Sequence, residues 1–269
     1  MSDVKKKKLS IVMITHYLDL VWRSVLFLVV LVIWITDMIN GKDTLVHQMK
    51  EHWVILSVLW LFFAGEMIIR FFPSKIRSPG CQKQFAINYI KTGNTEIHIP
   101  DNHATVMVAL LWIVLNGVFG ALHTLGILND GFMLLLCCAY SVCDVICILF
   151  FCPFQSWFFK NRCCATCRIY NWDYAMMFTP LFFVPGIYTW SLLALSVMLL
   201  LKWEVTFYLH PERFSENTNG YLKCSNCTEK LCRHKKQLAP LWKSIDQFTR
   251  DRIQLLRHDV KYDNDKEGK

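Results

Sequence analysis

Charged side chains are scarce in this sequence. Asp, Glu, Lys and Arg make up 19% of its 269 residues, and they gather near the chain ends and in the segments between long apolar runs. Hydrophobic residues make up 54% and aromatic residues 14%, which is richer than an ordinary globular chain. An α-helix of about 20 charge-poor residues is long enough to cross the hydrocarbon of a bilayer. The scarcity of charge therefore predicts an integral membrane protein.

Motifs of the common enzyme classes are also missing. The chain has no nucleophile elbow, Walker loop, dinucleotide glycine fingerprint, HExxH or paired-carboxylate motif. Its formal net charge is +8, but no nucleic-acid-binding signature accompanies this charge, and the accumulation of Lys and Arg in cytoplasmic loops explains it. We therefore expect the lipid bilayer as the main surroundings of the chain, and no nucleic-acid partner.

Apolar blocks alternate with polar segments, and five can be recognised: Leu18–Ile39, Trp53–Phe72, Thr105–Ile127, Phe132–Phe151 and Tyr174–Trp203. They predict an all-α, polytopic integral membrane helical bundle over residues 17–203. Arg23 and Asp37 lie near the ends of the first block, where we expect them to reach the headgroups. No signal-peptide cleavage site follows this block, so it should stay as an anchor. Four consecutive lysines within residues 1–16 predict a cytoplasmic N-terminus and insertion into the cell membrane, plasma or inner.

The fifth apolar block is too long for one straight span and is interrupted by Pro180 and by Pro185-Gly186. It forms either one kinked, tilted helix or a half-helix, a break and a second helix that returns to the same side. With a cytoplasmic N-terminus, five full crossings place the tail outside, whereas a re-entrant block keeps it inside. The tail from Lys202 onward holds 14 Lys and Arg against 10 Asp and Glu, which favours the inside.

Three polar segments are predicted to form a small cytoplasmic, Cys-rich layer: residues 73–103, 152–173 and 204–269. In the first, AINYI and TEIHI alternate apolar with polar residues, which predicts a β-hairpin insertion, with an irregular loop as the alternative. The second lies between two apolar blocks and should lie at the membrane surface. In the third, apolar residues recur at near-helical spacing over Leu238–Val260 and predict an amphipathic helix.

Cysteine spacing in these segments points to a metal site. Two Cys-x2-Cys pairs, Cys164/Cys167 and Cys224/Cys227, offer the four thiolates of a closed tetrahedral site for zinc, and an iron–sulfur cluster fits the same set. Further ligand-type residues stand nearby: Cys163, Cys232, His210 and His234. In a reducing compartment these thiols bind metal in preference to forming disulfides. The alternative is that they are unliganded or redox-active.

A second group of sulfur-containing residues lies in the apolar blocks. Cys143 and Cys147 are four residues apart and so share one helix face, and Met176 and Met177 follow in the next block. Such soft ligands suit the passage of Cu(I). The competing interpretation is ordinary packing of small residues between helices.

Three ionisable side chains lie inside the predicted spans: Glu66, His123 and Asp144. A charged carboxylate near the bilayer centre costs about 2.5 kcal/mol or more, so these side chains should face the bundle interior. The functional hypothesis is a proton or cation path through all three. In the structural alternative, a neutral Asp144 is hydrogen-bonded to Asn116 or to a tyrosine, and Glu66 pairs with Arg70 one helical turn further on.

These features support three classes of function. The first is a membrane protein with a cytoplasmic thiolate metal or iron–sulfur site, which passes electrons between a cytoplasmic redox partner and a membrane carrier such as a quinone. The second is a small ion, proton or metal transporter with a structural zinc site. The third is a membrane scaffold or assembly factor that binds its partners through the tail helix.

Overall fold

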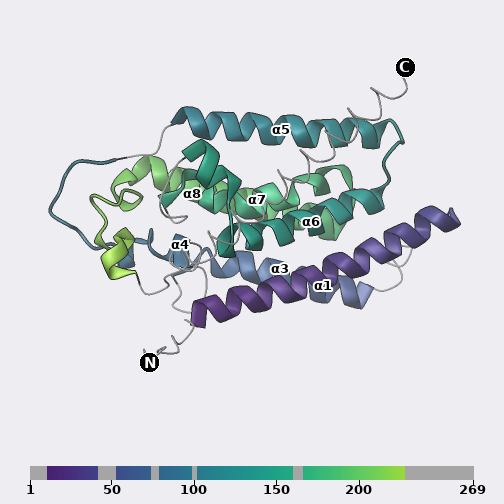
Figure 1. Cartoon of the computed structure of the whole chain (residues 1–269), viewed down its shortest axis with the longest axis horizontal. Coiled ribbons are helices and arrows are strands. Elements are labelled where there is room, and N and C mark those ends of the chain that lie inside the picture. The colour runs from purple at the N-terminus through teal and green to yellow at the C-terminus, as the bar shows by residue number, and fades with distance from the viewer. Residues whose placement is uncertain (1–10, 42–52, 74–78, 99–101, 160–165, 228–269) are drawn as a thin grey trace, which may run out of the picture. The chain divides into compact units, whose positions relative to one another are not determined.

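The computed structural model describes residues 11–41, 53–73, 79–98, 102–159 and 166–227 (Figure 1). Its long helices are α1 (Ile11–Asn40), α5 (Asn102–Thr124), α6 (Asp130–Leu149) and α8 (Ile187–Leu209). All four are long and apolar enough to cross a membrane. A shorter apolar helix, α3 (Trp53–Ile69), corresponds to the second predicted block. The prediction of an all-α chain is therefore confirmed over the residues that the structure describes, and its four long apolar helices fit a multi-pass membrane protein.

Short helical segments connect or cap these helices: α4 (Pro79–Gln82), η1 (Ala86–Asn88), the π-helix η2 (Phe154–Phe159), η4 (Arg168–Trp172), α7 (Asp173–Phe178), η5 (Thr179–Phe183), η6 (Pro211–Arg213), η7 (Gly220–Leu222) and η8 (Cys224–Asn226). The tail helix predicted over Leu238–Val260 lies outside the described residues. The predicted Cys-rich layer can therefore be followed only in part.

Helices α5 and α6 are joined by a tight turn that also holds α1. Asn129 caps α6, because its Oδ1 accepts a hydrogen bond from the Phe132 backbone N–H at 3.0 Å. The same oxygen accepts from Trp34 Nε1 at 3.1 Å, so α1 is anchored to this turn. Along the rest of its length α1 packs against α6 (Figure 1).

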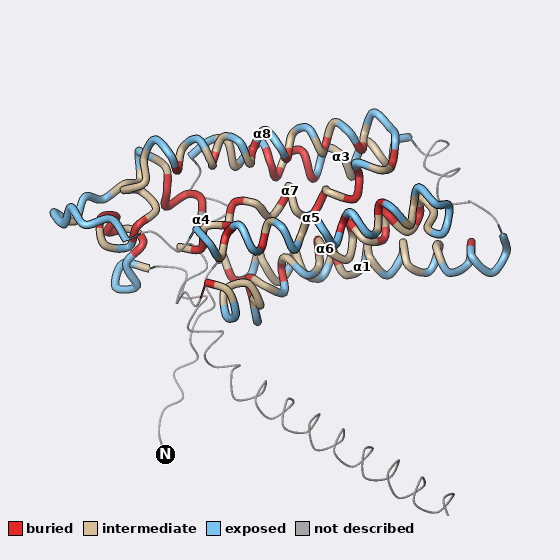
Figure 2. The backbone as a smooth tube through the Cα atoms, turned by 90° about the horizontal axis from the view of Figure 1, so that it is seen from above, coloured by how far each residue is buried: buried red, intermediate tan, exposed pale blue. Residues whose placement is uncertain are grey.

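Burial is concentrated where α3, α6, α7 and α8 meet, whereas α1 has few buried residues (Figure 2). The core cluster there includes Phe63, Met67, Tyr174, Phe178 and Trp203. Large apolar side chains are exposed along α1, α5 and α8. So much contiguous apolar surface is rare on a water-soluble monomer, and it fits the surface of a protein in lipid.

The fifth apolar block is broken and reverses direction. Helix α7 and η5 run to Val184, and α8 then begins after Pro185-Gly186 and packs back along them. The Arg168 guanidinium pairs with Glu204 near the end of α8, and Trp172 Nε1 donates to Glu204 Oε1 at 2.7 Å. The two ends of the block therefore lie together, as the second of the two predicted arrangements requires.

The predicted β-hairpin is wrong over the described residues 79–98, which contain two short helices and no strand. The extended backbone after η1 pairs with a distant segment instead of with TEIHI. Lys91 forms an isolated antiparallel bridge with Asn219, and the Gly220 N–H donates to the Ile90 carbonyl at 2.7 Å. This pairing brings the segment after α8 onto the segment after α3.

Candidate ionic site

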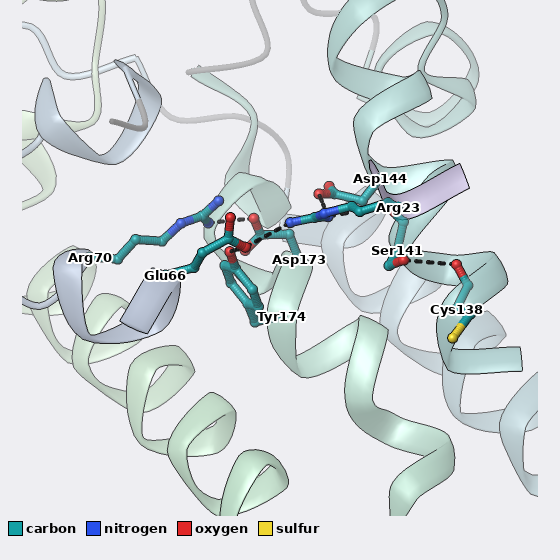
Figure 3. A network of polar contacts seen from close by, with 8 residues as sticks. All are labelled: Arg23, Glu66, Arg70, Cys138, Ser141, Asp144, Asp173 and Tyr174. Carbon is teal, nitrogen blue, oxygen red and sulfur yellow. Dashed lines mark hydrogen bonds and ion pairs between the residues drawn. The ribbon is translucent and has the colours of Figure 1, made fainter. Parts of the chain in front are cut away.

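A buried arginine joins three helices. Arg23 of α1 is only 4% exposed, and its Nη2 lies 2.9 Å from Glu66 Oε2 of α3. Its Nη1 lies 3.4 Å from Asp144 Oδ2 of α6 and donates to the Ser141 carbonyl at 3.1 Å (Figure 3). One planar guanidinium therefore bridges two carboxylates through two different nitrogens, in the fixed fork geometry of an arginine.

A second arginine extends the network to α7. Arg70, just beyond α3, pairs with Asp173, and its guanidinium lies 4.5 Å from the centre of the Tyr174 ring. Tyr174 in turn donates its hydroxyl to Glu66 Oε2 at 2.8 Å.

The Arg23 site, as we call this network, comprises Arg23, Glu66, Arg70, Asp144, Asp173 and Tyr174. It contains three carboxylates against two guanidiniums. A cavity of about 40 Å³ adjoins it and is also lined by Thr15, His16 and Asp19 of α1. This space is large enough for a few water molecules. The site thus combines an excess of carboxylate with a polar cavity.

Two of the three predicted path residues meet here. Glu66 and Asp144 share Arg23, whereas His123 lies at the other end of α5, where its Nε2 is 2.7 Å from Asp130 Oδ1. The partner considered for Asp144, Asn116, instead accepts a hydrogen bond from the Tyr140 hydroxyl at 3.4 Å. The described residues therefore do not place the three predicted groups in one cluster.

The expectation that Arg23 and Asp37 reach the headgroups is wrong, because both are buried at 4% and 5% exposure. Arg23 turns inward because α3 and α6 present Glu66 and Asp144, and buried carboxylates need a cation. Charge balance among the apolar blocks was the signal that would have identified it. No such signal pointed to the other partners, Asp173 and Tyr174, because they stand at the junction of the polar segment 152–173 and the fifth apolar block.

The predicted thiolate ligands are only partly described: Cys163, Cys164, Cys232 and His234 lie outside the described residues. Cys167 is buried in a small apolar cluster with Val108, Phe159 and Ile169. Among the residues that the structure describes, no three His, Cys, Asp or Glu side chains form a metal-binding group. The zinc or iron–sulfur site therefore stays a prediction.

The second Cys-x2-Cys pair lies beyond α8. Cys224 is exposed, and the half-buried Cys227 has Lys83 Nζ 3.7 Å from its Sγ. His210, a further predicted ligand, has its Nδ1 3.2 Å from Glu212 Oε1. Lys83 is therefore a hydrogen-bond partner of Cys227 that the spacing of the cysteines could not reveal.

The sulfur-containing residues of the apolar blocks do come together. Cys143, Cys147, Met176 and Met177 line one cavity of about 300 Å³ between α5, α6 and α7. Their juxtaposition was expected from sequence, and the passage of Cu(I) among them stays a hypothesis.

Comparisons of this chain with protein-family models, curated proteins and solved structures give no match. The roles of the Arg23 site and of the cysteines therefore rest on the contacts described above. Of these, the bridge from Arg23 to two carboxylates is the best defined chemically.

Proposed function

We propose that the protein is a multi-pass membrane transport protein that takes up a proton or a small cation at the Arg23 site. The observation that carries this proposal is the pairing of one buried guanidinium with carboxylates from two different helices. Across the whole site, three carboxylates face two guanidiniums among the described residues, so carboxylates outnumber guanidiniums by one. A buried excess carboxylate is stable only if it binds a proton or a cation.

Asp144 is the carboxylate best suited to this exchange. Glu66 is held by two short contacts, 2.9 Å to Arg23 and 2.8 Å to the Tyr174 hydroxyl, and is 7% exposed. Asp144 lies farther from Arg23, at 3.4 Å, and is 19% exposed. It also lines both the 40 Å³ polar cavity and the 300 Å³ cavity. A group at such a junction can exchange a proton or cation without dismantling the Arg23–Glu66 pair.

The proposed orientation places the N-terminus and the tail in the cytoplasm. The pairing of Arg168 with Glu204 supports a re-entrant fifth block, because it places the residues just before the block beside the C-terminal part of α8, where the block ends. The Arg23 site lies towards the C-terminal ends of α3 and α6, and in this orientation those ends face the cytoplasm. Access from that side runs through the cavity lined by the first turns of α1.

Flux through the purified full-length chain in liposomes tests the proposal. An imposed membrane potential should drive acidification, read by an enclosed pH dye, or movement of Na⁺ or K⁺. We expect Asp144→Asn to reduce this flux at least tenfold, since it removes the exchangeable charge. Asp130→Asn is the matched control on the same helix and should retain the flux. Absence of any flux, or equal flux in Asp144→Asn, would overturn the proposal.

A thiolate metal site is the second candidate, with Cys164, Cys167, Cys224 and Cys227 as ligands and zinc or an iron–sulfur cluster as the group held. Two hydrogen bonds support the approach of the two cysteine segments. Asn171 Nδ2 donates to Gln84 Oε1 at 2.7 Å, and Asn219 Nδ2 donates to the Lys83 carbonyl at 2.9 Å. Lys83 and Gln84, which are neighbours in the sequence after α3, thus bind one residue from each of the two cysteine segments.

Elemental analysis of the purified protein distinguishes the forms of this second candidate. Iron with an absorption band that bleaches on reduction by dithionite supports a cluster and electron transfer to a quinone-type carrier. Zinc without such a band supports a transport protein with a structural zinc site. If neither metal is bound and all thiols titrate freely, the metal site is excluded, and a scaffold role remains the proposal for the cysteine segments.

A further inference from the structure

A large cavity lies beside the Arg23 site and shares Asp144 with it, but the exchange proposed for that site does not account for a space of this size. Its volume is about 300 Å³, and its walls come from α5, α6, η2, η4 and α7. Cavities of this size hold small organic ligands. Most of the wall is apolar, with Trp112, Tyr140, Phe154 and Tyr170 as its aromatic members.

The charged groups of this wall are all of one sign. Asp144 and Asp173 line the cavity, and among the described residues that line it none is Lys, Arg or His. Arg23 and Arg70 contact these two carboxylates but line the separate 40 Å³ cavity instead. A ligand in the larger cavity therefore meets carboxylate and aromatic side chains, and the described part of the wall adds no cationic side chain.

Asp173, one of the residues that line this cavity, has a carboxylate oxygen without a donor in the described part of the chain. Asp173 is 9% exposed, and its Oδ2 pairs with Arg70, but its Oδ1 is buried with no hydrogen-bond partner among the described residues. Buried carboxylate oxygens are nearly always hydrogen-bonded, because leaving one unpaired is costly. An N–H donor in the cavity would satisfy it. Positive charge is also attracted to the faces of aromatic rings such as those that Trp112 and Tyr140 bring to the wall.

We propose that this cavity binds a lipophilic primary amine in its ammonium form. The ammonium group donates to Asp173 Oδ1 and faces Asp144, and the apolar part of the ligand packs against the aromatic residues and Met176. This proposal is independent of the ion movement proposed for the Arg23 site, because binding can be measured without flux.

A second cavity in the same molecule shows why charge matters. It measures about 360 Å³, lies between α1, α3, α6 and α8, and has no charged residue among the described residues that line it. Its members include Leu26, Phe63 and Leu192. It offers a neutral molecule as much room as the first cavity does, but the described part of its wall offers no carboxylate to an ammonium group. Selectivity for amines over neutral molecules therefore has to come from Asp144 and Asp173.

Protection of a cysteine tests the proposal on the unmodified chain. Cys143 lines the 300 Å³ cavity and is exposed, whereas Cys224 is exposed but is not among the residues that line it. We expect 4-phenylbutylamine at neutral pH to slow the labelling of Cys143 by N-ethylmaleimide at least fivefold, and to leave Cys224 unchanged. The neutral analogue 4-phenylbutanol should need at least a tenfold higher concentration to give the same protection. Sites of labelling are read by mass spectrometry of peptides.

Variants then separate charge from shape. Asp173→Asn should weaken protection by the amine at least tenfold and leave protection by the alcohol unchanged. Because this variant also removes the partner of Arg70 and can fail to fold, Asp130→Asn serves as the matched comparison: it changes a carboxylate that does not line the cavity, keeps Asp144 and Asp173, and should keep amine protection. Equal protection by amine and alcohol, or no protection of Cys143 by either, would overturn the proposal. Amine protection that survives Asp173→Asn would overturn the assignment of Asp173.

Discussion

The two ends of the α5–α6 pair are held by different means. Near the end of α6, charged groups meet in a buried network in which Arg23 and Glu66 are 4% and 7% exposed. At the α5–α6 turn the ionic pair is single, and its members His123 and Asp130 are 17% and 33% exposed. Phe183 of η5 packs there against α5, on the surface left by Gly120. One end depends on charge, and the other depends on shape.

This difference shows how burial determines the importance of an ion pair. A pair that water can reach contributes little, because solvent replaces a lost partner. A buried group cannot be rehydrated when its partner is removed, so the full cost of desolvation appears as lost stability. The number of partners at Arg23 therefore reflects the burial of its guanidinium as much as a role in transport.

The largest effect is expected for Arg23→Met, which removes the cation and leaves Glu66 and Asp144 buried without it. Breaking a buried ion pair in this way costs about 3–5 kcal/mol. Unfolding in detergent, followed by tryptophan fluorescence, measures the loss. The triple variant Arg23→Met, Glu66→Gln, Asp144→Asn has no unpaired charge at this position and should regain most of the stability. A loss of unfolding free energy below about 1 kcal/mol in the single variant would contradict the view that charge pairing stabilises this end of the molecule.

Arg23→Lys separates charge from geometry. The ammonium keeps the positive charge but has a single nitrogen, so it cannot repeat the 2.9 Å contact to Glu66 and the 3.4 Å contact to Asp144 from two nitrogens. We expect a loss of about 1.5–3 kcal/mol, the value of one hydrogen bond to a charged group. The same unfolding assay measures it. Stability equal to that of the original chain would show that charge alone holds this end.

Much of the helical architecture could be predicted from the sequence, because long charge-poor runs leave a helix as the natural way to satisfy the backbone in lipid. The partner of Glu66 and Asp144 could not be predicted from position alone. Arg23 stands close enough to the start of its block to reach water, and only the packing of α1 on α6 decides that it turns inward. The balance of acids and bases among the blocks was the available clue.

The β-hairpin failed for a related reason. The alternating pattern of AINYI and TEIHI describes a local preference, but the extended residues Ile90 and Lys91 pair with Asn219 and Gly220, more than 100 positions later. Local periodicity holds no information about a partner so distant in the sequence. The cysteine spacing has the same limit, since it shows that two thiols can share an ion but not which segments approach each other.

Close packing near the α5–α6 turn can be tested at Gly120. A methyl group there would overlap the Phe183 ring, and Ala at Gly117, one turn earlier on α5, would meet no atom within 4 Å. Overpacking of this kind costs about 1–3 kcal/mol. We therefore expect Gly120→Ala to destabilise the protein by that amount, and Gly117→Ala to be neutral or to stabilise it by up to about 1 kcal/mol. Equal effects of the two changes would contradict close packing of η5 on α5.

The smallest effect is expected for His123→Gln. The pair with Asp130 is short, at 2.7 Å, but both side chains are partly exposed at the turn, so water can replace either partner. The loss in unfolding free energy should stay below about 1 kcal/mol, as for other accessible pairs. Asp130→Asn removes the other partner and should have the same small effect, and neither change should alter flux through the Arg23 site. A loss comparable with that of Arg23→Met would mean that the α5–α6 turn is also held by charge, and that His123 belongs with Glu66 and Asp144 after all.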